Sequence, residues 1–166
     1  MPAFDDVYQQ HQDLVYNLCL HYLQNKEEAE EATQDIFVKI YRKMPEFRGE
    51  SSLKTWIYRI GIHHCLDLLK ARKTQKRFGF MALFRATPPL SHDPPDFNHP
   101  GVLLENKEEL EQLFGKINQL PPQQKTALVL KYLDDLPQRD IADIMGISEK
   151  AVESLLQRAK QTLKKG

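Results

Sequence analysis

Polar side chains along residues 148–165 have types and a spacing suited to contact with DNA bases. At ~100° per residue, a helix here would place its apolar residues on one face: Val152, Leu155, Leu156, Ala159 and Leu163. The opposite face would carry polar residues: Lys150, Ser154, Gln157 and Gln161. A glutamine amide can pair with adenine, a serine hydroxyl contacts several base edges, and a glutamate accepts a hydrogen bond from cytosine. We therefore expect this face to contact bases.

The residues before this stretch complete a recognisable motif. A short helix over Gln138–Met145 is predicted, followed by Gly146, which suits a tight turn, and Ser148, which suits the N-cap of the next helix. This is the pattern of a helix-turn-helix, whose second helix enters the major groove. The candidate DNA contacts are Arg139, Ser148, Lys150, Glu153, Ser154, Gln157 and Arg158. For this segment alone, an ordinary helical hairpin is the alternative.

Basic and aromatic residues are interleaved along residues 47–77. Aromatic rings can stack on unpaired bases while cations follow the phosphates, so the pattern is typical of a surface for single-stranded nucleic acid. The candidate contacts are Phe47, Arg48, Ser51, Ser52, Lys54, Trp56, Arg59 and His63. The alternative is that Trp56 and Tyr58 belong to the core, since Trp56 lies on the main apolar stripe of its predicted helix.

A net charge of zero hides two regions of opposite charge. Residues 1–38 contain eight acidic residues and one lysine, whereas residues 39–80 contain eleven basic residues and three acidic ones. This asymmetry favours two different partners, and the alternative is a pair of helices that compensate each other. In a predicted second helix, one polar face offers a protein-docking surface, or simply a solvated face: Glu31, Gln34, Asp35, Lys39 and Arg42.

The remaining reactive residue types give no sign of catalysis. Cys19 and Cys65 lack CxxC spacing and lie among apolar residues, which favours two small core residues in a reducing cytoplasm. Adjacent His63, His64 and Cys65 do not share a helical face, so we expect no metal site. We find no phosphate-binding glycine loop, no signal peptide and no apolar run of the ~20 residues that span a bilayer. We expect a cytoplasmic protein that is not an enzyme and needs no cofactor.

Helical periodicity predicts an all-α fold. In residues 4–22, apolar side chains recur at spacings of three and four, which indicates a first helix. Asn25 begins a capping-box pattern at the start of a second helix. Either Ser51 or Ser52 is expected to cap a third helix that reaches about Lys73.

Residues 78–102 break this periodicity. They contain five prolines, which exclude a continuous helix, and the stretch is too long for an ordinary loop in a compact domain. Helices resume near Leu103, and Pro122 suits the first position of another helix. We therefore predict two small helical domains, residues 1–77 and 103–166, joined by a proline-rich linker at 78–102.

Two segments resemble parts of bacterial extracytoplasmic-function (ECF) sigma factors of the sigma-70 family. The segment EEATQDIFVKIYRKMPEFRGESSLKTWIYRIGIHHCLDLLK resembles region 2 of these factors. The segment INQLPPQQKTALVLKYLDDLPQRDIADIMGISEKAVESLLQRAKQTLKK resembles region 4, which contains the helix-turn-helix. The order and separation of the two segments match the family, and only the proline-rich linker falls outside the resemblance.

The resemblance implies a transcription initiation factor that binds core RNA polymerase and directs it to specific promoters. The acidic helix face from Glu31 to Arg42 would engage the clamp helices of the largest polymerase subunit. The candidates between Phe47 and His63 would melt and capture the nontemplate strand of the minus-ten element. The helix-turn-helix would read the minus-thirty-five element.

Partners follow from the same resemblance. Such factors are commonly held inactive by an anti-sigma protein, often anchored in a membrane. We therefore expect core RNA polymerase, promoter DNA and an anti-sigma factor as partners, no small-molecule substrate, and a location in the cytoplasm or, when inhibited, at the inner membrane face. Two alternatives are a helix-turn-helix regulator that binds DNA without polymerase and a helical adaptor that binds only protein. The neutral net charge and Glu153 argue against the regulator, and the adaptor leaves residues 47–77 unexplained.

Glu153 and Leu155 stand where the family often carries lysine or arginine. A sigma factor does not bind its promoter alone, because polymerase supplies most of the salt-dependent phosphate contacts. A weakly charged recognition helix can then still discriminate between bases. We hypothesise that Glu153 penalises binding to non-specific DNA.

Overall fold

The computed structural model describes residues 2–82 and 107–165. Within these ranges every regular element is helical, which confirms the all-α prediction for them. The α-helices are α1 (Phe4–Leu23), α2 (Lys26–Lys43), α3 (Leu53–Ala82), α4 (Lys107–Gln119), α5 (Pro122–Leu128), α6 (Gln138–Met145) and α7 (Glu149–Lys165). A 3₁₀ turn, η1 (Met44–Glu46), follows α2, and a π-helical turn, η4 (Val129–Leu133), follows α5.

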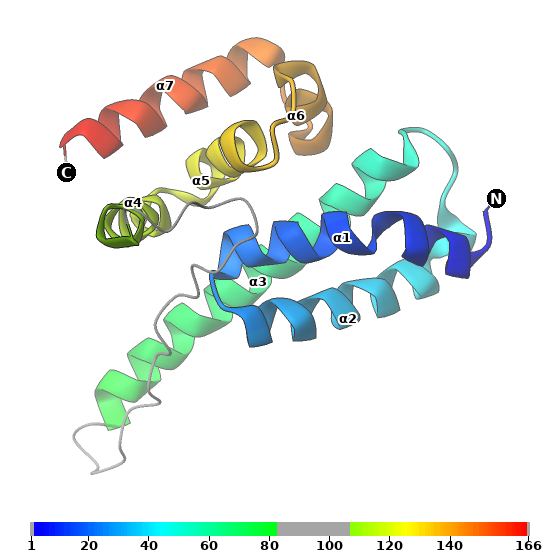
Figure 1. The fold of residues 1–166 in the computed structure, drawn as a ribbon, viewed down its shortest axis with the longest axis horizontal. Coiled ribbons are helices and arrows are strands. Elements are labelled where there is room, and N and C mark those ends of the chain that lie inside the picture. The colour runs from blue at the N-terminus through cyan, green and yellow to red at the C-terminus, as the bar shows by residue number, and fades with distance from the viewer. Residues whose placement is uncertain (1, 83–106, 166) are drawn as a thin grey trace.

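The first half of the chain is a unit of three helices. Helices α1 and α2 lie side by side and antiparallel, and the long α3 crosses them, as Figure 1 shows. Helices α1 and α3 pack closely at Gly61, where a Cβ would lie 2.9 Å from Cδ2 of Leu18. Any larger residue at this position would require the Leu18 side chain to shift.

The predicted caps of the first half are present. The Asn25 side chain accepts a hydrogen bond from the Glu28 N–H at 3.0 Å. Of the two candidate serines, Ser52 is the cap of α3, since its Oγ accepts from the Thr55 N–H at 3.1 Å. These side chains satisfy backbone donors that have no partner inside the helix.

Helix α3 is longer than the sequence predicted. It was expected to end near Lys73, and it continues to Ala82. Residues 74–78 contain neither proline nor glycine, so nothing in the local sequence terminates the helix there. The first five residues of the predicted linker are thus helical, and its remaining residues, 83–102, lie outside the described part of the chain.

The second half contains the predicted helix-turn-helix. Gly146 ends α6 with a φ of 69°, the left-handed conformation that favours glycine. The Ser148 side chain accepts from the Ala151 N–H at 3.0 Å and caps α7. Pro122 is the first residue of α5, as predicted.

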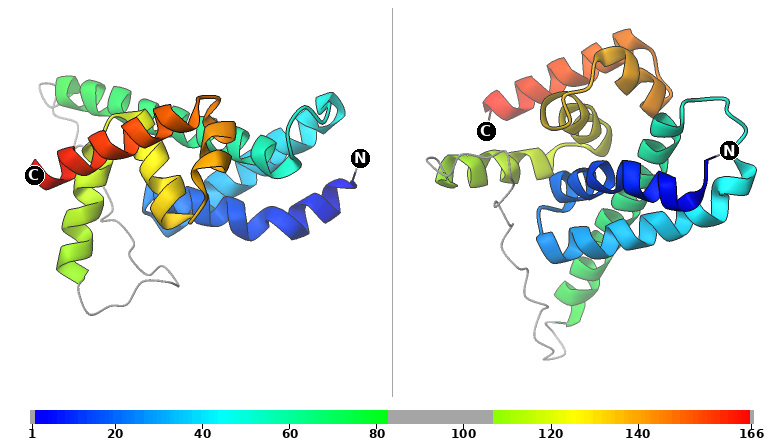
Figure 2. Two further views of the ribbon diagram at one scale, coloured as in Figure 1. Left: turned by 90° about the horizontal axis from the view of Figure 1, so that it is seen from above. Right: turned by 45° about the vertical axis from the view of Figure 1, so that its right-hand side comes forward.

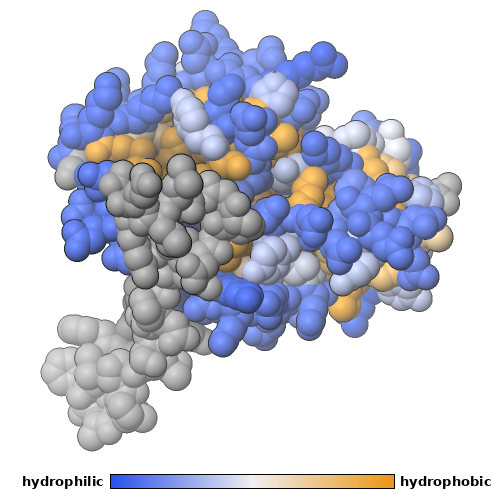
Figure 3. All heavy atoms as spheres, viewed as in Figure 1, coloured by the Kyte–Doolittle hydropathy of each residue, from blue (hydrophilic) through white to orange (hydrophobic). Residues whose placement is uncertain are grey.

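The two halves lie directly against each other. The second half sits over α1 and the first turns of α3 (Figures 1 and 2), and one hydrophobic core runs through both. Its fully buried members include Leu18 and Ile57 from the first half and Leu130 and Ile141 from the second. A smaller cluster is confined to the second half: Ile117, Leu120, Leu128 and Ala159. Figure 3 shows hydrophobic residues reaching the surface in bands between hydrophilic areas.

Candidate polymerase and nucleic-acid interfaces

The recognition helix α7 is buried on one face and open on the other. Val152, Leu156 and Ala159 are buried, in agreement with the predicted apolar stripe. All candidates for the minus-thirty-five element are exposed: Arg139, Ser148, Lys150, Glu153, Ser154, Gln157 and Arg158. Farther along α7, the Lys160 ammonium lies 5.2 Å from the centre of the Tyr132 ring, a cation–π contact within the second half. The helix therefore presents a polar face that is free to enter a groove.

The start of α3 joins aromatic and polar candidates for the minus-ten element. The rings of Phe47 and Trp56 lie 5.0 Å apart at an interplanar angle of 44°. Trp56 is half-buried and packs against the core, so it can stabilise the fold and also offer the exposed part of its ring to a base. Arg48 and Lys54 are exposed nearby. Two aromatic faces beside two cations suit unpaired bases and their phosphates.

Tyr58 and Arg59 both contact other parts of the protein and are not simply exposed to DNA. Tyr58 is buried, so here the core alternative holds. Its burial, together with the negative charge of Asp134, raises the pKa of its hydroxyl. The Arg59 guanidinium is half-buried and donates hydrogen bonds to the carbonyl oxygens of Asp143 and Ile144, the latter at 3.2 Å. These carbonyls belong to α6, so a predicted minus-ten residue contacts the helix-turn-helix.

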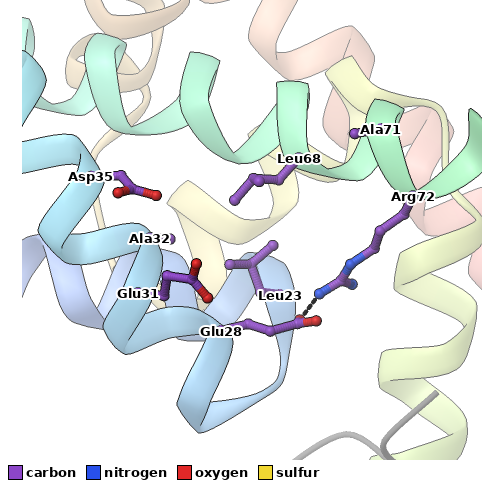
Figure 4. A pocket seen from close by; sticks show the side chains of 8 residues that line it. All are labelled: Leu23, Glu28, Glu31, Ala32, Asp35, Leu68, Ala71 and Arg72. Carbon is purple, nitrogen blue, oxygen red and sulfur yellow. Dashed lines mark ion pairs between the residues drawn. The ribbon is translucent and has the colours of Figure 1, made fainter. Parts of the chain in front are cut away.

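A pocket of about 220 Å³ lies between α2 and α3 at the predicted polymerase-binding face. Figure 4 shows Glu28, Glu31 and Asp35 lining it from α2, opposite Arg72 of α3. Glu28 and Arg72 form an ion pair, and burial lowers the pKa of Arg72. Because Glu28 is paired, Glu31 and Asp35 remain as carboxylates able to receive a partner's basic side chain. Glu31, Gln34, Asp35 and Arg42 are all exposed.

His64, which the sequence analysis considered only as a metal ligand and excluded, lies between Lys39 and Asp35. The Lys39 ammonium donates to His64 Nδ1 at 2.8 Å, and His64 Nε2 lies 3.8 Å from Asp35 Oδ2. A ring that accepts at Nδ1 carries its proton at Nε2 and stays neutral. Burial and the neighbouring Lys39 charge lower the pKa of His64, in keeping with that state.

His63, His64 and Cys65, which are adjacent in the sequence, point in different directions. His63 Nδ1 lies 2.8 Å from its own helix at the Arg59 carbonyl, while His64 faces Lys39. Cys65 faces Cys19 with 3.9 Å between the sulfur atoms, and both are buried. The hydrogen bond with Cys19 and burial raise the pKa of the Cys65 thiol, so it is a poor nucleophile. Among the residues described here, no three potential ligands come together.

Sequence reasoning missed a set of buried polar residues between the two halves. The Lys125 side chain is only 3% exposed, and the Tyr22 hydroxyl bonds to Thr126. His21 Nδ1 of α1 forms a hydrogen bond of 2.8 Å with Oδ1 of Asp134, which lies just after η4. The one signal in the sequence was Lys125, a charged residue two positions before the apolar run Ala127–Leu130. In the ranges that the structure covers, no helix is both long and apolar enough to cross a membrane.

In a comparison with known protein families, each half of the chain matches a different family model. A model of sigma-70 region 2 matches residues 7–75, and a model of sigma-70 region 4 matches residues 110–163. The fold and its helix-turn-helix thus define a sigma factor of the sigma-70 class. The ECF RNA polymerase sigma factor SigW of Bacillus subtilis is 30% identical over 166 residues, covering 98% of this chain and 88% of SigW. The chain belongs to the ECF family of RNA polymerase sigma factors.

Other relatives and solved structures agree with this assignment. The RNA polymerase sigma-H factor of Pseudomonas aeruginosa is 29% identical over 168 residues, covering 98% of this chain and 85% of that factor. The sigma factor RpoE of Bartonella quintana, in complex with the anti-sigma factor NepR, aligns with a TM-score of 0.65 and 18% identity. That alignment covers 98% of this chain and 94% of the other. At such identity the likeness shows a shared fold.

Proposed function

We propose that this protein is a transcription initiation factor that binds core RNA polymerase and directs it to specific promoters. The observation that carries the proposal is α7. It is a recognition helix with seven exposed polar candidates in and around it, in a chain whose first half matches sigma-70 region 2. The basic residues of α7 lie mostly toward its C-terminal end, and a reading face that includes Glu153 is suited to a protein that meets DNA together with a larger, basic partner.

The polymerase-binding site would be the pocket between α2 and α3 and its exposed rim. Glu31 and Asp35 supply negative charge there, and Gln34 and Arg42 add hydrogen-bonding groups. Lys39 takes part by holding His64 beside Asp35. Such a surface fits a helical partner that carries basic side chains.

The minus-ten element would be bound by the loop before α3 and by its first turns. The Phe47 and Trp56 rings would stack on unpaired bases, while Arg48 and Lys54 would neutralise phosphates. Ser51 and the cap residue Ser52 shape this loop, and Arg59 and His63 extend the surface along α3. Each of these roles is a proposal from residue type and placement.

The minus-thirty-five element would be read by the open face of α7. Ser154 and Gln157 are the side chains best suited to base edges, while Lys150, Arg158 and Arg139 would contact phosphates. Glu153 would accept from a cytosine in the correct site and repel phosphates elsewhere. We propose domains at residues 1–77 and 103–166, with 78–102 between them; the matches at residues 7–75 and 110–163 support this division.

An anti-sigma factor is the proposed regulator. In two structures with the same fold, the sigma factor is bound to an anti-sigma protein: RpoE with NepR, and CnrH with the cytosolic domain of CnrY. CnrH aligns with a TM-score of 0.64 and 19% identity, covering 97% of this chain and 84% of that one. Control by such a partner would place this protein in the cytoplasm or at the inner membrane face.

The proposal is tested by runoff transcription with purified core RNA polymerase on fragmented DNA from the source organism. Discrete start sites that depend on the added protein are expected. Without new start sites and without co-elution with core polymerase, the proposal fails. A plain DNA-binding assay then separates an autonomous regulator from a protein adaptor.

A matched pair of variants locates the polymerase site. Asp35→Lys reverses a charge on the rim of the α2–α3 pocket and is expected to abolish co-elution with core polymerase. Glu30→Lys makes the same kind of charge reversal at an exposed position of α2 that does not line the pocket. Equal losses in both variants would show that overall charge, and not this pocket, determines binding.

A further inference from the structure

A second pocket, of about 500 Å³, lies beside α3 and is called here the α3–α5 pocket. One side is a face of α3 within residues 63–73, and the other is formed by the end of α1 and by residues within 118–125. It shares Leu23 and Arg72 with the α2–α3 pocket. Its volume falls in the range of ~300–1,000 Å³ that is typical of sites for small molecules.

The apolar walls of the α3–α5 pocket are mostly aliphatic. They are formed by four leucines and a proline: Leu23, Leu66, Leu69, Leu120 and Pro122. The ring of the aromatic lining residue Tyr22 is buried, and the Lys125 ammonium lies 5.2 Å from its centre. The pocket therefore offers apolar area to an alkyl chain but no open aromatic face on which a planar ring could stack.

The charged lining of the α3–α5 pocket is mostly positive. Its described members are four basic residues and one acidic residue: Lys70, Arg72, Lys73, Lys125 and Asp67. Arg72 is paired with Glu28. No ion pair with another described residue is found for Lys70, Lys73 or Lys125. Unpaired like charges around an apolar cavity repel one another and attract an anion.

Lys125 is the basic residue of this group that is removed from solvent. It is 3% exposed, and its ammonium donates to the Tyr22 carbonyl at 3.0 Å and to Asn118 Oδ1 at 3.1 Å. An ammonium has three N–H donors, so one is left without an acceptor among the described residues. Burial and the nearby cations Arg72 and Lys73 lower the pKa of Lys125 to about 8. An anion placed here would accept from the free donor and stabilise the charge.

We propose that the α3–α5 pocket binds a small organic anion with an alkyl chain, with the chain against the leucines and the headgroup at Lys125 and Lys73. A carboxylate and a phosphate monoester offer lysine the same kind of acceptor oxygen, so the proposal covers both headgroups. Of the residues proposed to bind promoter DNA, His63 alone is among the described lining residues. The inference therefore goes beyond the proposed function and does not rest on it.

The ligand class is tested with octanoate and octyl phosphate, each titrated into the full chain by calorimetry. Octanol has the same chain without a charge, and octylamine has the same chain with the opposite charge. The anions should bind at least about tenfold more tightly than octanol, as expected for one charge-assisted hydrogen bond, and octylamine should not bind. The tighter of the two anions identifies the headgroup. If neither anion binds, or if octanol binds equally well, the inference is wrong.

A matched pair of variants tests the charge of the pocket. Lys73→Met removes an exposed cation from the lining and should weaken octanoate binding by roughly fivefold. Lys43→Met removes the same charge at an exposed position of α2 that does not line the pocket, and it should leave binding unchanged. Equal losses in both variants would overturn the inference, because overall charge would then explain the binding.

A second pair tests the location of the alkyl chain. Leu69→Trp adds a large side chain to the lining and is expected to abolish octanoate binding by filling the pocket. Leu113→Trp makes the same change at an exposed position of α4 outside the lining, and binding should persist. Circular dichroism checks that both variants are folded. A folded Leu69→Trp protein that binds octanoate as the wild type does would overturn the location.

A pH profile separates direct contact with Lys125 from a structural role. The groups that face Lys125 come from α1, α3 and α4: Tyr22, Cys65, Arg72, Lys73 and Asn118. The pKa of the Cys65 thiol is raised, so this group stays neutral between about pH 7.5 and pH 9. Octanoate pairs with charged Lys125, so its binding should weaken by roughly eightfold over this range as Lys125 loses its proton.

Lys125→Met provides the control for this profile. It replaces the buried ammonium by an apolar side chain of similar length, so the variant should fold. Octanoate should bind it about tenfold more weakly at pH 7.5, and its affinity should not change up to pH 9. A pH dependence that persists in Lys125→Met, or that is absent from the wild type, would overturn the contact with Lys125.

Discussion

Helices α3 and α7 are both proposed to contact DNA, but the fold holds them in different ways. Helix α3 packs against α1 and α2 and also meets α6, so its first half is largely covered, whereas Asp67, Lys70 and Lys73 farther along are exposed. Helix α7 packs mainly against α5 and α6 of the second half and leaves its polar face open. In α3 the residues for stability and for binding alternate, whereas in α7 they lie on opposite faces.

This difference predicts how substitutions will act. A change in α3 disturbs packing and DNA contact together, because Trp56 and Arg59 flank the buried Ile57 and Tyr58. A change on the open face of α7 alters promoter choice while stability stays the same. Residues on the open face of α7 can therefore be exchanged to suit a different promoter with little loss of stability.

The largest effect is expected from Ile57→Ala in α3. Ile57 is fully buried in the core shared by both halves, so truncation should lower the free energy of unfolding by about 2–5 kcal/mol. Denaturant unfolding measures this. The control is Gln161→Ala on the open side of α7, which should stay within about 0.5 kcal/mol of the wild type. A loss as large in Gln161→Ala would contradict the distinction between the helices.

The next effect is expected from Gln157→Ala on the open face of α7. A glutamine that pairs with one base contributes about 1–3 kcal/mol of discrimination against other bases. Runoff transcription on promoters altered one base at a time should therefore show relaxed preference at one position of the minus-thirty-five element. Gln123→Ala, at an exposed position of α5, is the matched control. Unchanged preference in Gln157→Ala would remove this residue from the reading face.

Glu153→Lys tests the hypothesis that the recognition helix disfavours non-specific DNA. The change removes a repulsive charge and adds an attractive one, so binding of the full chain to random duplex should tighten by roughly tenfold at low salt. The slope of log affinity against log salt should steepen by about one phosphate contact. Glu111→Lys carries the same charge change on α4, away from α7. No gain in a salt-titrated assay, or an equal gain in both variants, would refute the hypothesis.

The smallest effect is a pH dependence that reports the burial of Lys125 between the two halves. The pKa of Lys125 is lowered to about 8 by burial and by Arg72 and Lys73, with Cys65 opposing. Between about pH 8 and pH 9.5 the unfolded chain binds the extra proton, so Lys125 makes stability rise with pH. The raised pKa of the Cys65 thiol acts in the opposite sense.

Because Lys125 and Cys65 influence each other's pKa, the wild type and Lys125→Met are compared with Cys65→Ala in both, which removes the contribution of Cys65. The difference in unfolding free energy, wild type minus Lys125→Met, should increase across this pH range. A difference that does not change with pH would show that Lys125 is not buried in solution.

Local chemistry in the sequence predicted most of the helix boundaries. Asn25, Ser52 and Ser148 each cap the helix that the sequence predicted them to cap, and Gly146 makes the predicted turn. These signals are reliable because each satisfies backbone groups within a few residues of itself. The end of α3 was predicted wrongly, at Lys73, because residues 74–78 contain no glycine or proline and the helix continues through Gly79 to Ala82.

The exposed candidates were also found from the sequence. Helical periodicity separated the buried stripe of α7 from its polar face, and all seven minus-thirty-five candidates are exposed. The same reasoning left Trp56 and Tyr58 undecided between core and surface. Tyr58 is buried because it packs in the core that both halves share, which periodicity in one helix cannot reveal.

The helices, their caps, the helix-turn-helix and the two regions of opposite charge can be read from the sequence, because each follows from residues close together in the chain. Which polar groups meet across the two halves is apparent from the folded structure alone. His21 and Asp134 are 113 positions apart, and Arg59 and Ile144 are 85 apart. No local pattern encodes such pairs, since their approach depends on how the whole core packs.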